Sequence, residues 1–382
     1  MNNELTNFAA RLRERIPLMA ATEAARPGRV SNPEVKAGQA LPHDPEQTFN
    51  ADALELFGLQ FRCNAAYARV CEARQLTPQT VKHWTQIPFV PTAAFKDLEL
   101  SSIPAGQRTA VFHSSGTTEQ RPSRHFHGPE SLALYEASLW HWFEPNVGAG
   151  NEFVSLTPDS NGAPRSSLVH MFETIRQHSR KAAFFGSASA DGVWTIDFEA
   201  VVQKLKSAAA EGSPLTLLGT AFSFVHLLDF LAENNVRIRL SPGSRVMETG
   251  GYKNRSRTMP KNELHSFISK QLGVPPSHII CEYGMSELSS QAYDCAAHSG
   301  PLMTSPRIFH FPPWARAQIV SPETGEEVAD GESGLIRILD LANVFSVAAV
   351  QTEDLGVRRG EGFELIGRPQ LAEARGCSLM TA

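Results

Sequence analysis

The strongest constraint on this chain is a regular alternation of strand-length and helix-length segments between residues 152 and 282. Short apolar runs typical of buried strands alternate with longer amphipathic segments of helical period. This alternation predicts an α/β fold of βαβ units, with a mainly parallel sheet flanked by helices and ligand sites beyond the carboxyl ends of its strands. We expect strands at 153–156, 182–185, 215–218, 246–248 and 279–282, and helices at 166–177, 198–210, 222–234 and 261–272.

The regions on either side of this core differ in pattern. Residues 1–50 are expected to form one amphipathic helix and then an extended, proline-containing segment that wraps the surface. Residues 51–300 are the α/β core, beginning with a helix over about 51–75. Residues 301–368 are expected to form a small β-rich subdomain, because short apolar runs there are separated by Gly, Asp and Pro turns. Residues 369–382 are a short C-terminal tail.

Composition excludes several classes of protein. The 382 residues suggest two to three domains, and 35 basic against 40 acidic residues give a net charge of −5, which argues against a nucleic-acid partner. The most apolar stretch, 215–232, contains His226 and Asp229, so we expect no membrane span. Five scattered cysteines and no secretory pattern at the N-terminus indicate a cytoplasmic enzyme. Homo-oligomerisation stays open.

Familiar catalytic signatures are absent from the sequence. It contains no Walker-type phosphate loop, no G-x-G-x-x-G, no H-E-x-x-H and no G-x-S-x-G. His125 and His127 alternate as strand neighbours do, and Cys281, Cys295 and His298 could in principle converge on a metal. Because no second closely spaced Cys or His pair accompanies them, we favour ordinary packing over zinc.

A run of small hydroxylated residues carries the first chemical signal. Ser114, Ser115, Gly116, Thr117 and Thr118 form a poor core segment and a poor helix. They form a good cradle for an anion, because glycine lets the backbone approach while N–H and hydroxyl groups donate to phosphate oxygens. A Ser/Thr-rich surface turn is the alternative interpretation.

Two further segments strengthen the anion hypothesis. Tyr283, Gly284, Ser286 and Glu287 follow an expected strand, so an aromatic ring and a carboxylate lie at its carboxyl end. Downstream, Asp354 is expected at a strand-to-turn junction, where a carboxylate can accept both hydroxyls of a ribose. Arg368 follows and can reach ribose or phosphate.

In this order and at these separations the segments resemble the adenylate-forming superfamily of acyl- and aryl-CoA synthetases. They are most similar to one branch, the acyl-protein synthetases of the bacterial bioluminescence fatty-acid reductase system. The resemblance covers most of the chain from about Leu54 to the end. It rests on the sequences IPFVP (87–91), TGGYKNRSR (249–257), EYGMSELSSQ (282–291) and AEARGC (372–377).

The resemblance implies an ATP-dependent ligase that makes an acyl adenylate and releases pyrophosphate. Mg²⁺ is implied as its cofactor, with Glu287 as the metal ligand, since a hard cation takes carboxylate and phosphate oxygens. Ser114 to Thr118 would hold the phosphates and Asp354 the ribose. The residues that would bound the adenine are Tyr283, Gly250, Gly251 and Tyr252.

Two departures from the superfamily pattern matter. Glu119 follows the hydroxyl-rich run where a glycine and then a lysine are usual, so we expect its carboxylate to point away from polyphosphate. The sequence also stops 14 residues after Arg368, where most relatives continue into a further domain with an assisting lysine. We therefore expect the full C-terminal domain to be lacking. Whether Lys253, Arg255, Arg257 or a partner supplies the missing charge stays open.

Cys377 is the candidate for the second half-reaction. It lies five residues from the end of the sequence beside Arg375, and a neighbouring cation favours the reactive thiolate. Nine residues separate it from Arg368, so the thiol could range about 30 Å. The resemblance implies that this cysteine carries the acyl group as a thioester and passes it to an acyl reductase subunit.

Several alternatives stay open. A CoA ligase of the phenylacetate type would share the adenylation site, and a non-catalytic subunit would bind nucleotide only to hold a complex together. His170 either lines the carboxylate end of the acyl site or is a core histidine. The acid itself is not readable, because Phe222, Phe224, Leu227 and Leu228 fit an apolar tunnel or the buried face of a helix.

Overall fold

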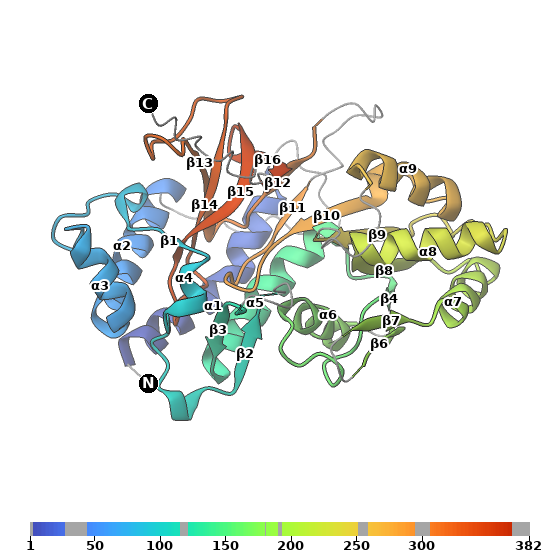
Figure 1. Ribbon diagram of the computed structural model, residues 1–382, viewed down its shortest axis with the longest axis horizontal. Helices are drawn as coiled ribbons and strands as arrows, with labels where there is room; N and C mark the ends of the chain where they lie inside the picture. The colour runs from blue at the N-terminus through green and yellow to red at the C-terminus, as the bar shows by residue number, and fades with distance from the viewer. Residues whose placement is uncertain are drawn as a thin grey trace, which may run out of the picture.

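The sheet that organises the molecule has twelve strands, in the order β13-β14-β15-β16-β12-β11-β10-β9-β8-β4-β5, with β1 paired to β15 (Figure 1). The computed structural model describes residues 3–26, 44–114, 121–179, 181–189, 193–250, 259–294 and 306–368. Neighbouring strands from β5 to β10 run parallel, and those from β10 to β13 run antiparallel. The α/β class expected from the sequence is confirmed.

The parallel half contains the strands and helices expected from the apolar alternation. Its strands are β4 (Glu152–Ser155), β5 (Ala182–Phe184), β8 (Leu215–Thr220), β9 (Arg245–Thr249) and β10 (Ile279–Tyr283). Its helices are α6 (Ser167–His178), α7 (Phe198–Ala210), α8 (Ala221–Glu233) and α9 (Lys261–Leu272).

Four of these strands, β4, β8, β9 and β10, are largely buried on both faces because helices cover both sides. Along β10, Ile279 belongs to the core beneath α7, α8 and α9, whereas Ile280 belongs to the core beneath α1, α5 and α6. Successive strand side chains point to opposite faces, so a continuous apolar run is what such a strand requires. Phe224, Leu227 and Leu228 are buried in the α8 side of this core.

The antiparallel half continues the same sheet through β10 and β11. The described part of 301–368, which we expected as a β-rich unit, therefore shares its hydrogen-bonded ladder with the α/β core. The strands of the antiparallel half are β11 (Ala292–Asp294), β12 (Ile308–His310), β13 (Ala315–Val320), β14 (Ser333–Asp340), β15 (Ala349–Arg359) and β16 (Gly362–Gly367). The short strand β1 (Val90–Pro91) pairs with β15.

The N-terminal region is more helical than expected. A helix begins at Pro45, inside the segment expected to be extended, because Asp44 caps it by accepting from the Glu46 N–H at 3.0 Å. The helix expected over 51–75 is interrupted at Asn64, whose side chain caps a second helix. The elements are α1 (Asn3–Ala24), α2 (Pro45–Cys63), α3 (Ala65–Ala73), α4 (Ala94–Asp97) and α5 (Pro129–Val147).

Short elements complete the described chain. They are the 3₁₀ turns η1 (Trp84–Gln86), η2 (Ala105–Gln107) and η3 (Pro276–His278), the hairpin of β2 (Ala110–His113) and β3 (Arg124–His127), and the hairpin of β6 (Gly186–Ala188) and β7 (Trp194–Ile196). Across the described ranges, none of the helices has the length and apolar character needed to cross a bilayer.

Candidate functional site

The second sequence motif lies where the sheet changes direction. Tyr283 ends β10, which pairs in parallel with β9 on one side and antiparallel with β11 on the other. The Tyr283 ring is 6 % exposed and packs edge-on against Phe309 and Phe363, with ring centroids 6.1 and 5.3 Å apart. This packing fixes the ring at the carboxyl end of a parallel strand, where α/β sheets bind ligands.

Asp354 meets this tyrosine from a distant part of the sequence. The Tyr283 hydroxyl donates to Asp354 Oδ2 at 2.9 Å, and Arg368 Nε donates to Asp354 Oδ1 at 3.2 Å. Burial and the adjacent Asp354 carboxylate together raise the pKa of Tyr283, so its hydroxyl keeps its proton and acts as a donor. The three residues that sequence analysis assigned to a nucleoside are therefore brought together.

A bulge in β15 aims Asp354 into this position. We expected a strand-to-turn junction here, but residues 352–354 lie inside β15, where the pairing skips from Leu335↔Leu355 to Arg337↔Gln351. The Thr352 hydroxyl donates to Ile336 O at 2.9 Å and accepts from the Asp354 N–H at 3.1 Å. β-Bulges commonly redirect side chains next to binding sites.

Only the first residue of the hydroxyl-rich run, Ser114, lies in the described part of the chain, between β2 and β3. Ser114 directly follows β2, and its hydroxyl accepts from the N–H of Ser123, the residue before β3, at 3.0 Å. Ser115, Gly116, Thr117 and Thr118 lie outside the described residues.

The Glu287 carboxylate connects the motif after β10 with Ser123, which follows the hydroxyl-rich run in the sequence. Ser123 Oγ donates to Glu287 Oε1, and Ser286 Oγ donates to Glu287 Oε2 at 3.0 Å. His125 Nδ1 lies 2.8 Å from Ser286 O, and burial lowers the pKa of His125 to about 4, so a neutral ring donates there through Nδ1–H. The hydroxyl oxygens that meet the carboxylate in the described part of the chain fit a hard cation such as Mg²⁺.

A buried polar network of Asn343 and Asp340 fixes the backbone of the Glu287 segment. Asn343 Nδ2 donates to Glu287 O at 2.7 Å, and Asn343 Oδ1 accepts from Ser289 Oγ at 2.6 Å. Asp340 accepts from the Ser289 N–H at 2.9 Å and from Ser290 Oγ at 2.7 Å. Burial raises the pKa of Asp340 to about 6 despite these donors. The backbone around Glu287 is thus fixed from the β14–β15 turn.

Two glycines in the motifs have structural reasons to be glycine. Gly250 follows β9 with φ +69°, a left-handed conformation that other residues rarely adopt. At Gly284 a Cβ would overlap Oε1 of Glu282, and the other carboxylate oxygen of Glu282, Oε2, accepts from the Thr249 hydroxyl. Gly251 and Tyr252 lie outside the described residues.

His170 belongs to an aromatic cluster next to this site. Its ring lies 5.2 Å from Phe112 and 5.6 Å from Tyr135, and its Nε2 is 3.1 Å from Glu136 Oε1. Its side chain is 24 % exposed, so it is neither a fully buried core histidine nor an open surface one.

Sequence reasoning missed three groups of the site and one candidate cannot be placed. Ser123 and Asn343 were not singled out, and His125 was noted only as a strand neighbour of His127. The alternation of Ser123, His125 and His127 along one strand after the hydroxyl-rich run was the available signal. Cys377 lies outside the described residues.

Comparison with known proteins identifies the family. The model of the family described as acyl-protein synthetase, LuxE, matches residues 146–382, more than half of the chain. The chain belongs to this family. As an acyl-protein synthetase it is an acid–thiol ligase, as the sequence motifs indicated.

Full-length relatives agree with this membership. The long-chain-fatty-acid–luciferin-component ligase of Aliivibrio fischeri is 23 % identical over 346 residues, which cover 86 % of each chain. The ligase of the same name from Vibrio harveyi is 21 % identical and aligns with 83 % of this chain and 82 % of its own.

Solved structures agree on the fold of this acyl-protein synthetase. An open conformation of 2-hydroxyisobutyryl-CoA ligase, crystallised with 2-HIB-AMP and CoA, superimposes with a TM-score of 0.62 at 14 % identity. The match covers 85 % of this chain and 74 % of that one. The adenylate-forming architecture expected from the motifs is therefore confirmed.

Proposed function

We propose that this acyl-protein synthetase activates a fatty acid with ATP and then carries the acyl group on Cys377 for delivery to an acyl reductase. In the first step a carboxylate oxygen of the acid attacks the α-phosphorus of ATP, and pyrophosphate leaves. In the second step the Cys377 thiolate attacks the acyl carbonyl of the mixed anhydride, AMP leaves and a thioester forms. The thiol proton passes to solvent.

The observation that carries the proposal is the contact between Tyr283 and Asp354. The two residues are 71 positions apart, yet the hydroxyl and carboxylate lie 2.9 Å from each other at the end of β10. An aromatic face beside a carboxylate suits a nucleoside, since the ring can stack on a base while the carboxylate accepts from ribose hydroxyls. Arg368, whose side chain is 70 % exposed, adds a positive charge on the open side.

The remaining ATP contacts are assigned from the motif positions. The hydroxyl-rich run is assigned to the phosphates, the segment after β9 together with Tyr283 to the adenine, Asp354 and Arg368 to the ribose, and Ser286 to the phosphates beside Glu287. The assigned residues are Ser114, Ser115, Gly116, Thr117, Thr118, Gly250, Gly251, Tyr252, Tyr283, Gly284, Ser286, Asp354 and Arg368.

Glu287 would hold Mg²⁺. The residue is 5 % exposed, and in the described part of the chain its carboxylate accepts from the hydroxyls of Ser123 and Ser286. A bound Mg²⁺ would neutralise phosphate charge during phosphoryl transfer. Ser123 orients the carboxylate, and neutral His125 fixes the backbone that carries it, so both act as positioning residues.

A fatty acid is proposed because the two full-length relatives are named as long-chain-fatty-acid ligases. His170 is assigned to the carboxylate end of the acid site, since it lies in the ring cluster that includes Phe112, His127 and Tyr135. The His127 ring lies 4.2 Å from that of His125, at a tilt of 38°. An acyl reductase is proposed as the partner because an enzyme-bound thioester needs an acceptor reaction that removes the acyl group.

The test is incubation with ATP, Mg²⁺ and a panel of labelled fatty and aryl acids, followed by intact-mass analysis. We expect an acyl adduct that hydroxylamine removes and that peptide mapping places on Cys377. Cys377→Ser should still release pyrophosphate with fatty acid but form no hydroxylamine-labile adduct, while the matched Cys63→Ser control should behave as wild type.

Two outcomes would contradict the proposal. Formation of acyl-CoA by Cys377→Ser at the wild-type rate, with no adduct on the wild-type protein, would replace the carrier role with a CoA ligase. Pyrophosphate release that does not depend on acid, Mg²⁺ and Glu287 would contradict the proposed adenylation step.

A further inference from the structure

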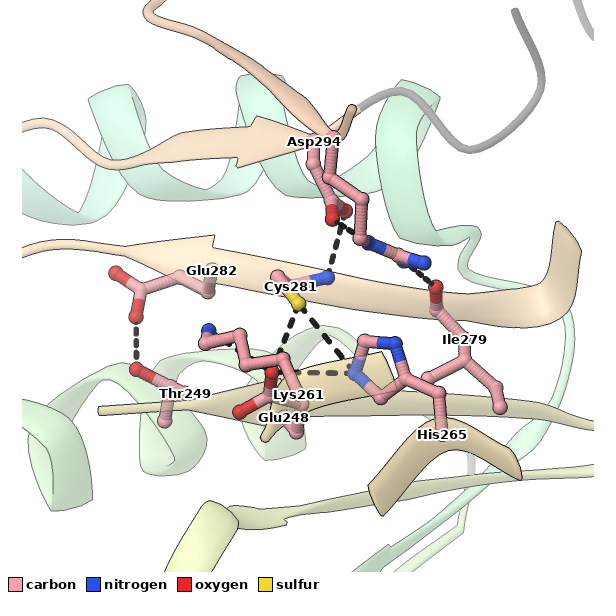
Figure 2. A network of polar contacts seen from close by, with 9 residues as sticks. Glu248, Thr249, Lys261, His265, Ile279, Cys281, Glu282 and Asp294 are labelled. Carbon is pink, nitrogen blue, oxygen red and sulfur yellow. Dashed lines mark hydrogen bonds and ion pairs between the residues drawn. The ribbon is translucent and has the colours of Figure 1, made fainter. Parts of the chain in front are cut away.

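Three metal-ligating side chains converge beneath the nucleotide end of the sheet. Glu248 of β9 and Cys281 of β10 are paired directly in the parallel ladder, and both side chains contact His265 of α9. His265 of α9 meets them, one helical turn after Lys261 (Figure 2). All three ligand atoms lie within 4.8 Å of one another. We call Glu248, His265 and Cys281 the Glu248 cluster.

The spacing of these atoms resembles one face of a metal tetrahedron. His265 Nε2 lies 3.3 Å from Glu248 Oε1 and 3.6 Å from Cys281 Sγ. Tetrahedral zinc with ordinary bond lengths separates nitrogen from oxygen by about 3.4 Å and nitrogen from sulfur by about 3.6 Å. Two of the three edges are therefore already at coordination distance.

The third edge is shorter than a metal site would have. The Cys281 thiol donates to Glu248 Oε1 at 2.7 Å, whereas ligands of one zinc ion would be about 3.6 Å apart. A metal replaces that proton, and the edge then opens.

One carboxylate oxygen of the cluster has no hydrogen-bond partner among the residues that the structure describes. Glu248 Oε1 is approached by Lys261 Nζ at 3.0 Å, His265 and Cys281, while Oε2 accepts from none of the described groups and the residue is 0 % exposed. A buried ionised oxygen without a donor is costly. Its presence is an observation independent of the ligand spacing, and it indicates that the carboxylate is arranged for a ligand besides the groups drawn in Figure 2.

We propose that the Glu248 cluster binds a borderline divalent cation of the Zn²⁺ type through a carboxylate, an imidazole and a thiolate, with water as the fourth ligand. Thiolate and imidazole together select zinc over magnesium or calcium. The thiol releases its proton to solvent, so the two anionic ligands balance the charge of the ion. Lys261 then leaves Glu248, and it can do so because its side chain is 37 % exposed and solvent is within reach.

The remaining charges around the cluster stay balanced. Asp294 and Arg307 form their own ion pair on the far side of β10, and Asp294 also accepts from the Cys281 N–H at 2.7 Å. The metal would tie β9, β10 and α9 together two residues before Gly250 and Tyr283. This is a structural role that does not depend on the identity of the acid or the acyl carrier.

The test replaces zinc with Co²⁺, because a cobalt–thiolate bond gives charge-transfer absorption in the near ultraviolet. Metal-free full-length protein, titrated with Co²⁺, should bind one equivalent and show this band. Cys281→Ser should lose the band, and the matched control that replaces Cys63, Cys295 and Cys377 with serine should keep it. His265→Gln carries the same test if Cys281→Ser does not fold.

A second variant distinguishes a metal site from a permanent ion pair between Glu248 and Lys261. Lys261→Met removes the competing cation, so it should bind Zn²⁺ at least about tenfold more tightly than wild type, and added Zn²⁺ should raise its melting temperature. A wild-type protein that shows no charge-transfer band at excess Co²⁺ would overturn the proposal. So would a band that persists in folded Cys281→Ser, or a Lys261→Met protein that Zn²⁺ does not stabilise.

Discussion

Asn343 offers a sharp test of how the site is held. It is 1 % exposed in the β14–β15 turn, and its amide makes three contacts. Nδ2 donates to Glu287 O at 2.7 Å and to Val347 O at 3.1 Å, and Oδ1 accepts from Ser289 Oγ at 2.6 Å. Asn343→Ala removes all three contacts and leaves the backbone bond from Gln60 to Asn343 O in place.

The size of the effect follows from the groups left unpaired. The Ser289 hydroxyl can rotate toward another acceptor, but the two carbonyl oxygens cannot move. A buried polar group that loses its partner costs about 1–3 kcal/mol. We therefore expect Asn343→Ala to lower the free energy of unfolding by about 4 kcal/mol. Because the Glu287 carbonyl is one of these groups, the Mg²⁺ concentration for half-maximal pyrophosphate release should also rise.

The assay is urea denaturation followed by tryptophan fluorescence, together with Mg²⁺ titration of pyrophosphate release at a temperature where the variant is folded. The matched control is Asn262→Ala, because Asn262 is exposed and, within the described ranges, its side chain accepts from the neighbouring Glu263 N–H at 2.9 Å and makes no other hydrogen bond. The control should stay within about 0.5 kcal/mol of wild type. An Asn343→Ala protein as stable as the control, or one that loses stability with no change in Mg²⁺ requirement, would refute the reasoning.

Three further predictions concern neighbouring groups. Ser123→Ala removes a hydrogen bond to the Glu287 carboxylate. Since hydrogen bonds to charged groups contribute about 1.5–3 kcal/mol, kcat/KM for pyrophosphate release should fall by about ten- to a hundredfold. An unchanged kcat/KM would contradict the positioning role. Tyr283→Phe keeps the buried ring but loses the hydrogen bond to Asp354. Calorimetry should show ATP binding weakened about tenfold, with thermal stability nearly unchanged. An ATP affinity equal to that of the wild type would argue against a nucleoside site there. Burial raises the pKa of Asp340 from its ordinary 3.8 to about 6, so between these pH values the native protein holds a proton that the unfolded chain has lost. The contribution of Asp340 to the free energy of unfolding therefore declines by about 3 kcal/mol as the pH rises from about 4 to 6. Asp340→Asn should lose that decline in denaturant titrations at both pH values, and a variant that keeps the wild-type slope would contradict the assignment.

The sequence by itself determined the α/β half of this protein. Buried parallel strands need apolar side chains on both faces, so their runs are visible without any knowledge of partners, and the structure has strands and helices in those places. The chemical motifs were equally visible, because phosphate and ribose contacts use short stretches of unusual composition. Family membership followed from those stretches and is confirmed by the family match.

Local signals failed where two physical effects compete at one residue. Pro45 breaks a helix interior but is favourable in the first turn, and only the Asp44 cap shows which effect applies. Asp354 belongs to a polar, turn-like stretch, yet β14 and β16 pair on either side of it, so a bulge forms in place of a turn.

Tertiary structure alone decided which distant groups meet. Ser123 and Glu287 are 164 residues apart, and Glu248 and Cys281 are 33 apart. Strand order and register bring each pair together, and neither is encoded in the spacing of a motif. A hydrogen bond or a metal ligand set requires atoms a few ångströms apart, and along a folded chain that proximity depends on how the strands assemble into the sheet.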